Sequence, residues 1–289
     1  MRSTSLLFSI IFLLAGHISL SQESISLNVI YEFTYVRDLA NKDIPYSANM
    51  VLSVGKHGSR YCPEKLYNEH DRNAEAARKK QQELQSASAR PMMVVSGGPL
   101  LLVNKYGAII NEEIVKDIPG RQLIQYAVMG IKSYRVETAL PAINWTIQHE
   151  KKTIDKYTCQ KAIGSYGGRT YEAWFTPDLP FQDGPWKLSG LPGLILEAQD
   201  TAHEVSFIFK ELSRNTDAEA TTQSFLNSEY SIKANLKDYI RAKAAFETDP
   251  ESITAAQAPN ARLAVKNIDE PGGQHAPRIR KYNLLEHGD

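Results

Sequence analysis

The side chains of this sequence that could do chemistry are few and mostly scattered. Three carboxylates near the middle of the chain, Asp178, Asp183 and Glu197, could supply the paired acids of a glycan or peptide hydrolase. Such enzymes need two carboxyl groups at a set separation, which a sequence does not give. Asp178 follows a proline and Asp183 precedes a glycine, so turn formation also explains them. The sequence therefore raises a hydrolase hypothesis but assigns no catalytic residue.

A second group of side chains could contact a ligand without catalysis. Several aromatic residues lie in sequence around Arg169 and Lys187, and strand alternation places Trp174 on the face opposite Tyr171 and Phe175. Aromatic rings and cations can stack on a sugar or a peptide, although aromatic rows more often build a core. The candidate ligand-contact residues are Arg169, Trp174 and Lys187.

The sequence lacks the usual metal and cofactor motifs. Its histidines stand singly, with neither His-Glu-x-x-His nor a paired Cys/His spacing. The glycines near residue 190 do not form a phosphate loop, because no Lys-Ser/Thr pair follows them. We therefore expect neither a metal site nor a cofactor.

Two cysteines, Cys62 and Cys159, are candidates for a disulfide. A bridge would close a loop of roughly 100 residues and add a few kcal/mol of stability through unfolded-state entropy. Cys159 lies in a strand-like pattern, where a buried free thiol is also common. The sequence leaves both states of this pair open.

The stretch "DGPWKLSGLPGLIL", residues 183–196, concentrates glycine and proline. Its first three residues have the composition of a turn, its proline favours extended backbone before it, and its later glycines allow another backbone to approach closely. Its large apolar side chains need a core. We predict a rigid, buried corner that leads into a strand over 194–198, with a structural role for Asp183, Gly184, Pro185, Trp186, Gly190, Pro192 and Gly193.

Alternating apolar residues predict a mainly β fold with antiparallel sheets and hairpins in one domain. Two of the hairpins have glycine or polar residues at the turn: 156–163 with 169–176, and 193–199 with 204–212. Further strands are expected within 24–36, 46–54, 92–96, 100–105, 122–129 and 131–138.

Two helices complete the expected elements. Residues 63–90 are charged and rich in helix formers, which indicates an inserted polar helix or a partly disordered excursion. Leu236, Tyr239, Ile240, Lys243 and Phe246 are spaced as one face of an amphipathic helix. We place the β-domain at 22–212 and the C-terminal helix with a loose tail at 213–289.

The first residues indicate export. Arg2, the apolar stretch 6–15 and the small residues Ser19 and Ser21 are typical of a secretory signal peptide over 1–21, cleaved after Ser21. No later stretch approaches ~18 consecutive apolar residues, so no membrane span is expected in the mature chain. Lys+Arg and Asp+Glu both number 33, which argues against a nucleic-acid partner. The expected location is the periplasm or the extracellular space.

From Tyr157 to Leu196, "YTCQKAIGSYGGRTYEAWFTPDLPFQDGPWKLSGLPGLIL", the chain resembles the GLPGLI family of secreted bacterial proteins, which is named for residues 190–195. Good matching covers roughly residues 144–197, and the elements on either side agree in layout only. Two features depart from the family pattern. Residues 282–286, "YNLLE", stand where Asn-Pro-Ile-Glu is common, and Cys62 is not a family position.

The resemblance implies a secreted, β-rich protein whose family has no established function. Such proteins are sometimes compared with the bowl-like accessory domain of a bacterial peptide-N-glycosidase. No catalytic residues can be transferred from the family. The leading hypothesis is a non-catalytic envelope or secreted protein that binds an envelope protein, a peptide or a glycan through one sheet face. The alternatives are a carboxylate-dependent hydrolase and a structural or carrier role in the periplasm.

Overall fold

The computed structural model describes residues 26–69, 102–104, 111–214, 226, 231–257, 264–266, 283 and 285–286. Within them the predicted mainly β fold is confirmed, since strands far outnumber helices. The predicted signal peptide, the strand at 92–96 and the polar helix beyond residue 69 lie outside the described residues. Residues 64–69 of that expected helix are helical.

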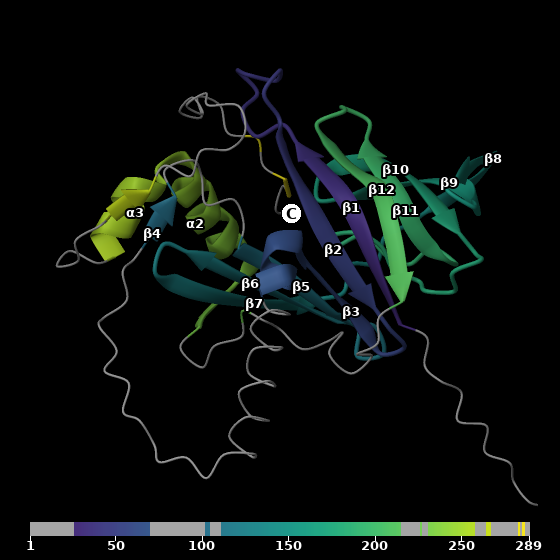
Figure 1. The fold of residues 1–289 in the computed structure, drawn as a ribbon, viewed down its shortest axis with the longest axis horizontal. Coiled ribbons are helices and arrows are strands. Elements are labelled where there is room, and N and C mark those ends of the chain that lie inside the picture. The colour runs from purple at the N-terminus through teal and green to yellow at the C-terminus, as the bar shows by residue number, and fades with distance from the viewer. Residues whose placement is uncertain are drawn as a thin grey trace, which may run out of the picture.

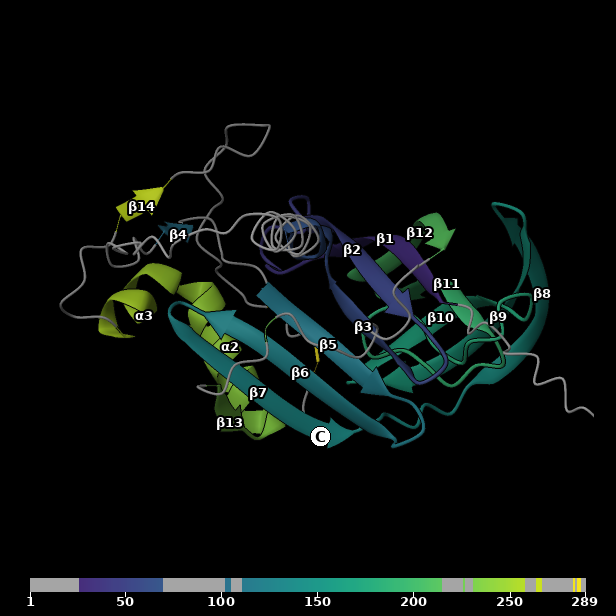
Figure 2. The same cartoon turned by 60° about the horizontal axis from the view of Figure 1, so that its bottom comes forward.

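Twelve strands form one sheet in the order β13-β7-β6-β5-β3-β2-β1-β12-β11-β10-β9-β8, and Figures 1 and 2 show how strongly it curves. Adjacent strands are antiparallel except β13 and β7, which are parallel. Strands β14 and β4 form a separate parallel pair. The strands are β1 (Leu27–Tyr35), β2 (Tyr46–Val54), β3 (Gly58–Pro63), β4 (Leu102–Asn104), β5 (Asn111–Asp117), β6 (Gln122–Met129), β7 (Lys132–Ala139), β8 (Thr146–Ile154), β9 (Tyr157–Tyr166), β10 (Arg169–Thr176), β11 (Leu194–Asp200), β12 (Val205–Arg214), β13 (Ile232–Ala234) and β14 (Ala264–Lys266).

Several predicted elements have their expected partners. The two predicted hairpins are present as β9 with β10 and β11 with β12, and the strands expected at 122–129 and 131–138 pair as β6 and β7. The predicted amphipathic helix is α2 (Leu236–Thr248), which α3 (Pro250–Gln257) follows. Asn235 caps α2 by accepting a hydrogen bond from the backbone of Asp238.

The register of the strands defines an inner face of the sheet. Residues that lie directly opposite one another share a face, so one row of side chains crosses the sheet from β1 to β7. It consists of Val29, Leu52, Tyr61, Ile114, Gln125 and Val136. A second row, from β1 to β9, consists of Phe33, Phe207, Ala198, Ala173 and Ala162. The three alanines leave room for other chain segments above them.

Two segments cover this inner face. Helix α2 packs Tyr239 and Phe246 against the β6–β7 end, together with Ala127 and Val136. The corner, residues 177–193, packs against the middle and the β9–β12 end. There the indole ring of Trp186 stacks on Phe207 with 6.3 Å between ring centroids. The inner face is therefore filled by parts of the same chain.

The corner is tightly built where the sequence analysis expected glycines to matter. Gly193 has φ +153°, and a Cβ added there would lie 2.1 Å from the carbonyl oxygen of Thr176. Trp186 adopts φ 54°, an uncommon conformation for a residue with a side chain. Trp186 and Leu188 are buried, whereas Gly190 and Pro192 are exposed.

The structure does not contain the candidate bridge between Cys62 and Cys159, because both thiols are free and buried. Cys62 is on β3 and Cys159 on β9, with β2, β1, β12, β11 and β10 between them in the sheet. This strand order separates the two cysteines. Burial raises the pKa of the Cys62 thiol to about 12 and that of Cys159 to about 11.

Candidate functional site

Strand β5 places two charged side chains on the inner face, Glu112 and Lys116, on either side of Ile114. Alternation along the strand puts all three on one side. Lys116 is fully buried, pairs with Asp183 of the corner and donates a hydrogen bond of 2.8 Å to the carbonyl oxygen of Gly184. Burial lowers the pKa of the Lys116 ammonium, and the Asp183 carboxylate offsets part of that shift. This ion pair anchors the corner to the sheet.

Glu112 anchors helix α2 in the same way. Its carboxylate accepts hydrogen bonds from Tyr239 Oη at 2.5 Å and Lys243 Nζ at 2.6 Å, and it also contacts Gln125 of β6. Burial raises the pKa of Glu112, but the charge and hydrogen bonds of Lys243 and the hydroxyl of Tyr239 outweigh it, so the pKa is lowered. Glu112 is therefore held ionised beneath α2.

Between α2 and the corner lies a third segment, remote in sequence, which we call the tail segment (Asn283, Leu285 and Glu286). The Asn283 amide donates to the carbonyl oxygen of Val36 at 2.8 Å and to Glu204 at 2.9 Å, and it accepts from Arg169 at 2.8 Å. The backbone N–H of Asn283 donates to the carbonyl oxygen of Arg37 at 2.7 Å. Both N–H donors of this amide and one of its two acceptor sites are used. The surroundings of this position are therefore complementary to a primary amide.

Glu286 is the charged anchor of the tail segment. Its two carboxylate oxygens accept hydrogen bonds from Tyr166 Oη at 2.6 Å and from Lys187 Nζ at 2.5 Å. Burial lowers the pKa of the Lys187 ammonium, and the Glu286 carboxylate offsets part of that shift. Gly167 has φ +58°, and a Cβ added there would lie 3.3 Å from Glu286 Cγ, so the β9–β10 turn closes on this residue.

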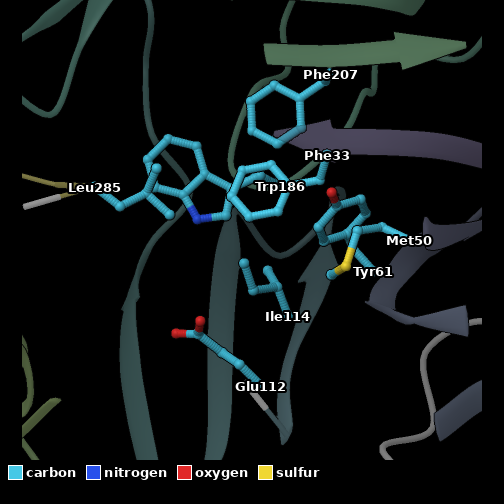
Figure 3. Close-up of a pocket in the computed structure, with 8 residues that line it drawn as sticks. All are labelled: Phe33, Met50, Tyr61, Glu112, Ile114, Trp186, Phe207 and Leu285. Carbon is cyan, nitrogen blue, oxygen red and sulfur yellow. The ribbon is translucent and has the colours of Figure 1, made fainter. Parts of the chain in front are cut away.

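Leu285 is the apolar anchor. It is 7% exposed and lines two small cavities, both of which Trp186 also lines. Figure 3 shows Leu285 pointing toward the indole ring of Trp186, with Phe207 and Phe33 beyond and Glu112 nearby. Each cavity has room for about one or two water molecules. The second cavity is lined by Gln125, Trp186, Tyr239, Ile240, Lys243, Leu285 and Glu286.

We call the surface that holds these three side chains the tail groove. Its walls are formed by the backbone after β1, the β9–β10 turn, the corner and α2, each of which bonds to the tail segment or lines a cavity with it. Its contacting residues are Val36, Arg37, Tyr166, Arg169, Trp186, Lys187 and Glu204.

Two of the three candidate ligand-contact residues meet in this groove. Arg169 is buried and pairs with Asp200 at 2.6 Å and Glu204 at 3.1 Å while it binds Asn283, and Lys187 binds Glu286. Burial lowers the pKa of Arg169, but its hydrogen bonds to both carboxylates outweigh this and raise it. Trp174 is half-buried elsewhere, with Lys152 Nζ 4.6 Å from its ring centroid.

The three carboxylates of the hydrolase hypothesis do not meet. Asp178 is exposed in a turn, Asp183 is buried in its ion pair with Lys116, and Glu197 pairs with Lys152 of β8. None of the three lines either cavity beside Leu285. The structure therefore gives Asp183 and Glu197 different ion-pair partners and leaves the side chain of Asp178 exposed.

Sequence reasoning missed Glu112, Lys243 and the tail segment as site residues. Two of these left a signal. Lys243 occurs within the apolar stripe of α2, where a lysine needs a partner when buried, and alternation along β5 puts Glu112 on the same face as Ile114. The role of Asn283, Leu285 and Glu286 depends on a fold that brings them to Arg169 and Lys187.

Among the described residues, no cluster of His, Cys, Asp or Glu could hold a metal ion, and no helix is long and apolar enough to span a membrane.

In comparisons with known proteins, a short stretch of the chain matches a family of unknown function, and the fold resembles two solved structures. Residues 166–197, which include the β9–β10 turn and the corner, match a family model described as a protein of unknown function (Porph_ging). Among curated proteins none matches the chain.

Two solved structures of PNGF-II, in space groups C2 and P21, resemble this fold with TM-scores of 0.50 and 0.51 and 14% sequence identity. The matches cover 76% and 78% of this chain but only 32% and 34% of the PNGF-II chain. The chain thus spans about a third of the length of PNGF-II, and the likeness concerns the fold alone.

Proposed function

We propose that this protein is an exported, non-catalytic binding protein of the GLPGLI type whose inner sheet face receives a short segment of polypeptide. One observation supports the proposal: the face already holds three side chains of its own chain, in the tail groove, through residues far from them in sequence. Asn283 is 114 residues from Arg169, and Glu286 is 99 residues from Lys187.

The chemistry of the groove supports binding rather than catalysis. Of its two buried cations, Arg169 is paired with Asp200 and Glu204 and also donates to Asn283, whereas the ion-pair partner of Lys187 is Glu286 of the tail segment. A buried cation is costly without a partner, so the position beside Lys187 favours a carboxylate. We do not favour the hydrolase alternative, because Asp183 and Glu197 are each engaged in a separate ion pair and Asp178 is exposed in a turn.

Export is part of this proposal and rests on the apolar stretch 6–15 and the small residues Ser19 and Ser21. We predict a mature N-terminus at Gln22. N-terminal sequencing of protein recovered from the envelope or medium checks this, and material that still begins at Met1 would refute it.

Peptide binding tests the proposed function. The probe is a fluorescein-labelled peptide with the sequence of residues 280–289, "RKYNLLEHGD", and the protein is the full chain carrying Asn283→Ala and Glu286→Gln to weaken its own tail segment. We expect saturable binding that unlabelled peptide reverses. The matched control carries Asn144→Ala and Glu150→Gln at exposed positions, and it should bind the probe far more weakly because its groove stays occupied.

A further inference from the structure

The tail groove contacts three side chains of the segment that occupies it: an amide, an aliphatic group and a carboxylate, in this order along the chain. The position of Asn283 accepts a primary amide, since it offers two acceptors and one donor to a single side chain. Two residues later, the aliphatic side chain of Leu285 is buried beside Trp186. The carboxylate of the next residue, Glu286, accepts hydrogen bonds from Tyr166 and Lys187. The pattern amide–any–aliphatic–acid describes this occupant.

Leu285 lies beside unfilled space in the interior. It lines both cavities beside Trp186, so withdrawing it would open space that is apolar next to Phe33 and Ile114 and polar next to Lys243. Withdrawing Glu286 at the same time would leave the buried ammonium of Lys187 without its counterion. An empty groove therefore favours a ligand that returns both an aliphatic group and a carboxylate.

We propose that the tail groove is a recognition site for peptide segments of a partner with the pattern amide–any–aliphatic–acid, and that the tail segment is a built-in competitor that occupies it until such a segment displaces it. This inference rests on the proposed function and adds the ligand class and the regulation. Because the tail segment is tethered, it competes at an effective concentration of about 1 mM. A tail segment whose own affinity for the groove is ~0.1 mM therefore weakens a competing ligand about tenfold.

The inference is tested by measuring how tightly each peptide of a panel binds to the full chain that carries Asn283→Ala and Glu286→Gln. The panel contains the 280–289 sequence and three versions in which the asparagine, the second leucine or the glutamate is replaced by alanine. We expect each replacement to weaken binding at least about tenfold, which corresponds to about 1.4 kcal/mol. Wild-type protein should bind the unchanged peptide about tenfold more weakly than the variant does.

The outcomes separate the two proposals. If no peptide binds the variant up to about 1 mM, a concentration that matches that of the tethered segment, the proposed function fails. If all four peptides bind equally, the proposed function stands and the recognition pattern is wrong. If wild-type protein binds as tightly as the variant, the tail segment is not a competitor. Should the double variant unfold, Leu285→Ala replaces it, since this change leaves the hydrogen bonds of Asn283 and Glu286 in place.

Discussion

At the scale of single residues, the inner face of the sheet is notable for its buried charged side chains. Lys116, Lys187 and Glu112 all lie on or against the inner face, and each has a partner from another part of the chain. Taking one partner away from such a pair typically costs about 3–5 kcal/mol, because the other charge stays buried. These pairs therefore fix where the corner, α2 and the tail segment lie against the sheet.

The pairing of Glu112 has a consequence for pH. Its folded-state pKa lies below the ordinary value of 4.5, so the stability it contributes is complete above about pH 4.5 and is lost as the pH falls through the folded value. We predict that unfolding free energy decreases with acidification below pH 4.5, and that Glu112→Gln makes this decrease shallower.

Urea unfolding between pH 3 and pH 6 measures this dependence. Glu150→Gln, which changes an exposed glutamate of β8, is the matched control and should keep the wild-type slope. The same acid slope in wild type and Glu112→Gln would show that Glu112 is not held ionised by Lys243.

The thiols give a second prediction at this scale. Burial raises the pKa of Cys62 to about 12 and that of Cys159 to about 11, and neither is bridged. We predict that a thiol reagent at pH 8 finds almost no reactive cysteine in folded protein and two in protein unfolded without reductant. An unfolded, unreduced protein with no reactive thiol would instead establish a disulfide.

At the scale of elements, the backbone conformation of the corner follows from its glycines and prolines. The clustering of glycine and proline predicted a turn with a close backbone approach, and Gly193 against Thr176 is such an approach. Trp186 packs between Tyr166 and Phe207, with ring-centroid distances of 5.4 Å and 6.3 Å.

We predict that Trp186→Ala lowers stability by about 3–5 kcal/mol, since it empties a core position. Gly193→Val should also destabilise, because a β-branched residue does not adopt this backbone conformation and its Cβ would overlap Thr176. Pro192→Ala, at an exposed position of the same corner, is the control and should change the melting temperature little. Unchanged melting temperatures for both Trp186→Ala and Gly193→Val would mean that the corner does not support the fold.

Strands and hairpins could be predicted from the sequence because each depends on a pattern within ten or so residues. Alternation marked β1 and β2, glycines marked the β9–β10 turn, and helical spacing marked α2. Their order in the sheet was not predictable in this way. The pairing of β1 with β12 joins residues about 180 positions apart, and no local pattern encodes it.

The site was predictable only in part for the same reason. The aromatic residues around Arg169 and Lys187 predict ligand contacts at these two positions, and in the structure both side chains bind residues of the chain's own tail segment. The partners Asn283 and Glu286 come from a short polar stretch without periodicity, so only the fold reveals them.

At the scale of the whole molecule, the protein is a curved sheet whose inner face is closed by its own chain. Helix α2 covers one end of the face (Figure 2), and the corner covers the middle. The tail segment lies between them, since all three line one cavity. The first two are joined to the sheet by a buried charge on β5 and by apolar packing. The tail segment is held by the Glu286–Lys187 ion pair, by side-chain hydrogen bonds and by one leucine, but its described residues belong to no helix or strand. We therefore expect it to open more readily than α2 or the corner.

Hydrogen exchange at the backbone amide of Asn283 in the wild-type chain tests this account most directly. That amide donates to the carbonyl oxygen of Arg37, so it is protected only while the tail segment is in the groove. If the tail segment leaves by local opening, the Asn283 amide will exchange at least about 100-fold faster than amides in the middle of β1, and millimolar peptide of sequence 280–289 will accelerate it further. If instead the Asn283 amide exchanges as slowly as those of β1, with or without peptide, the tail segment is a permanent part of the core and the groove is not a binding site.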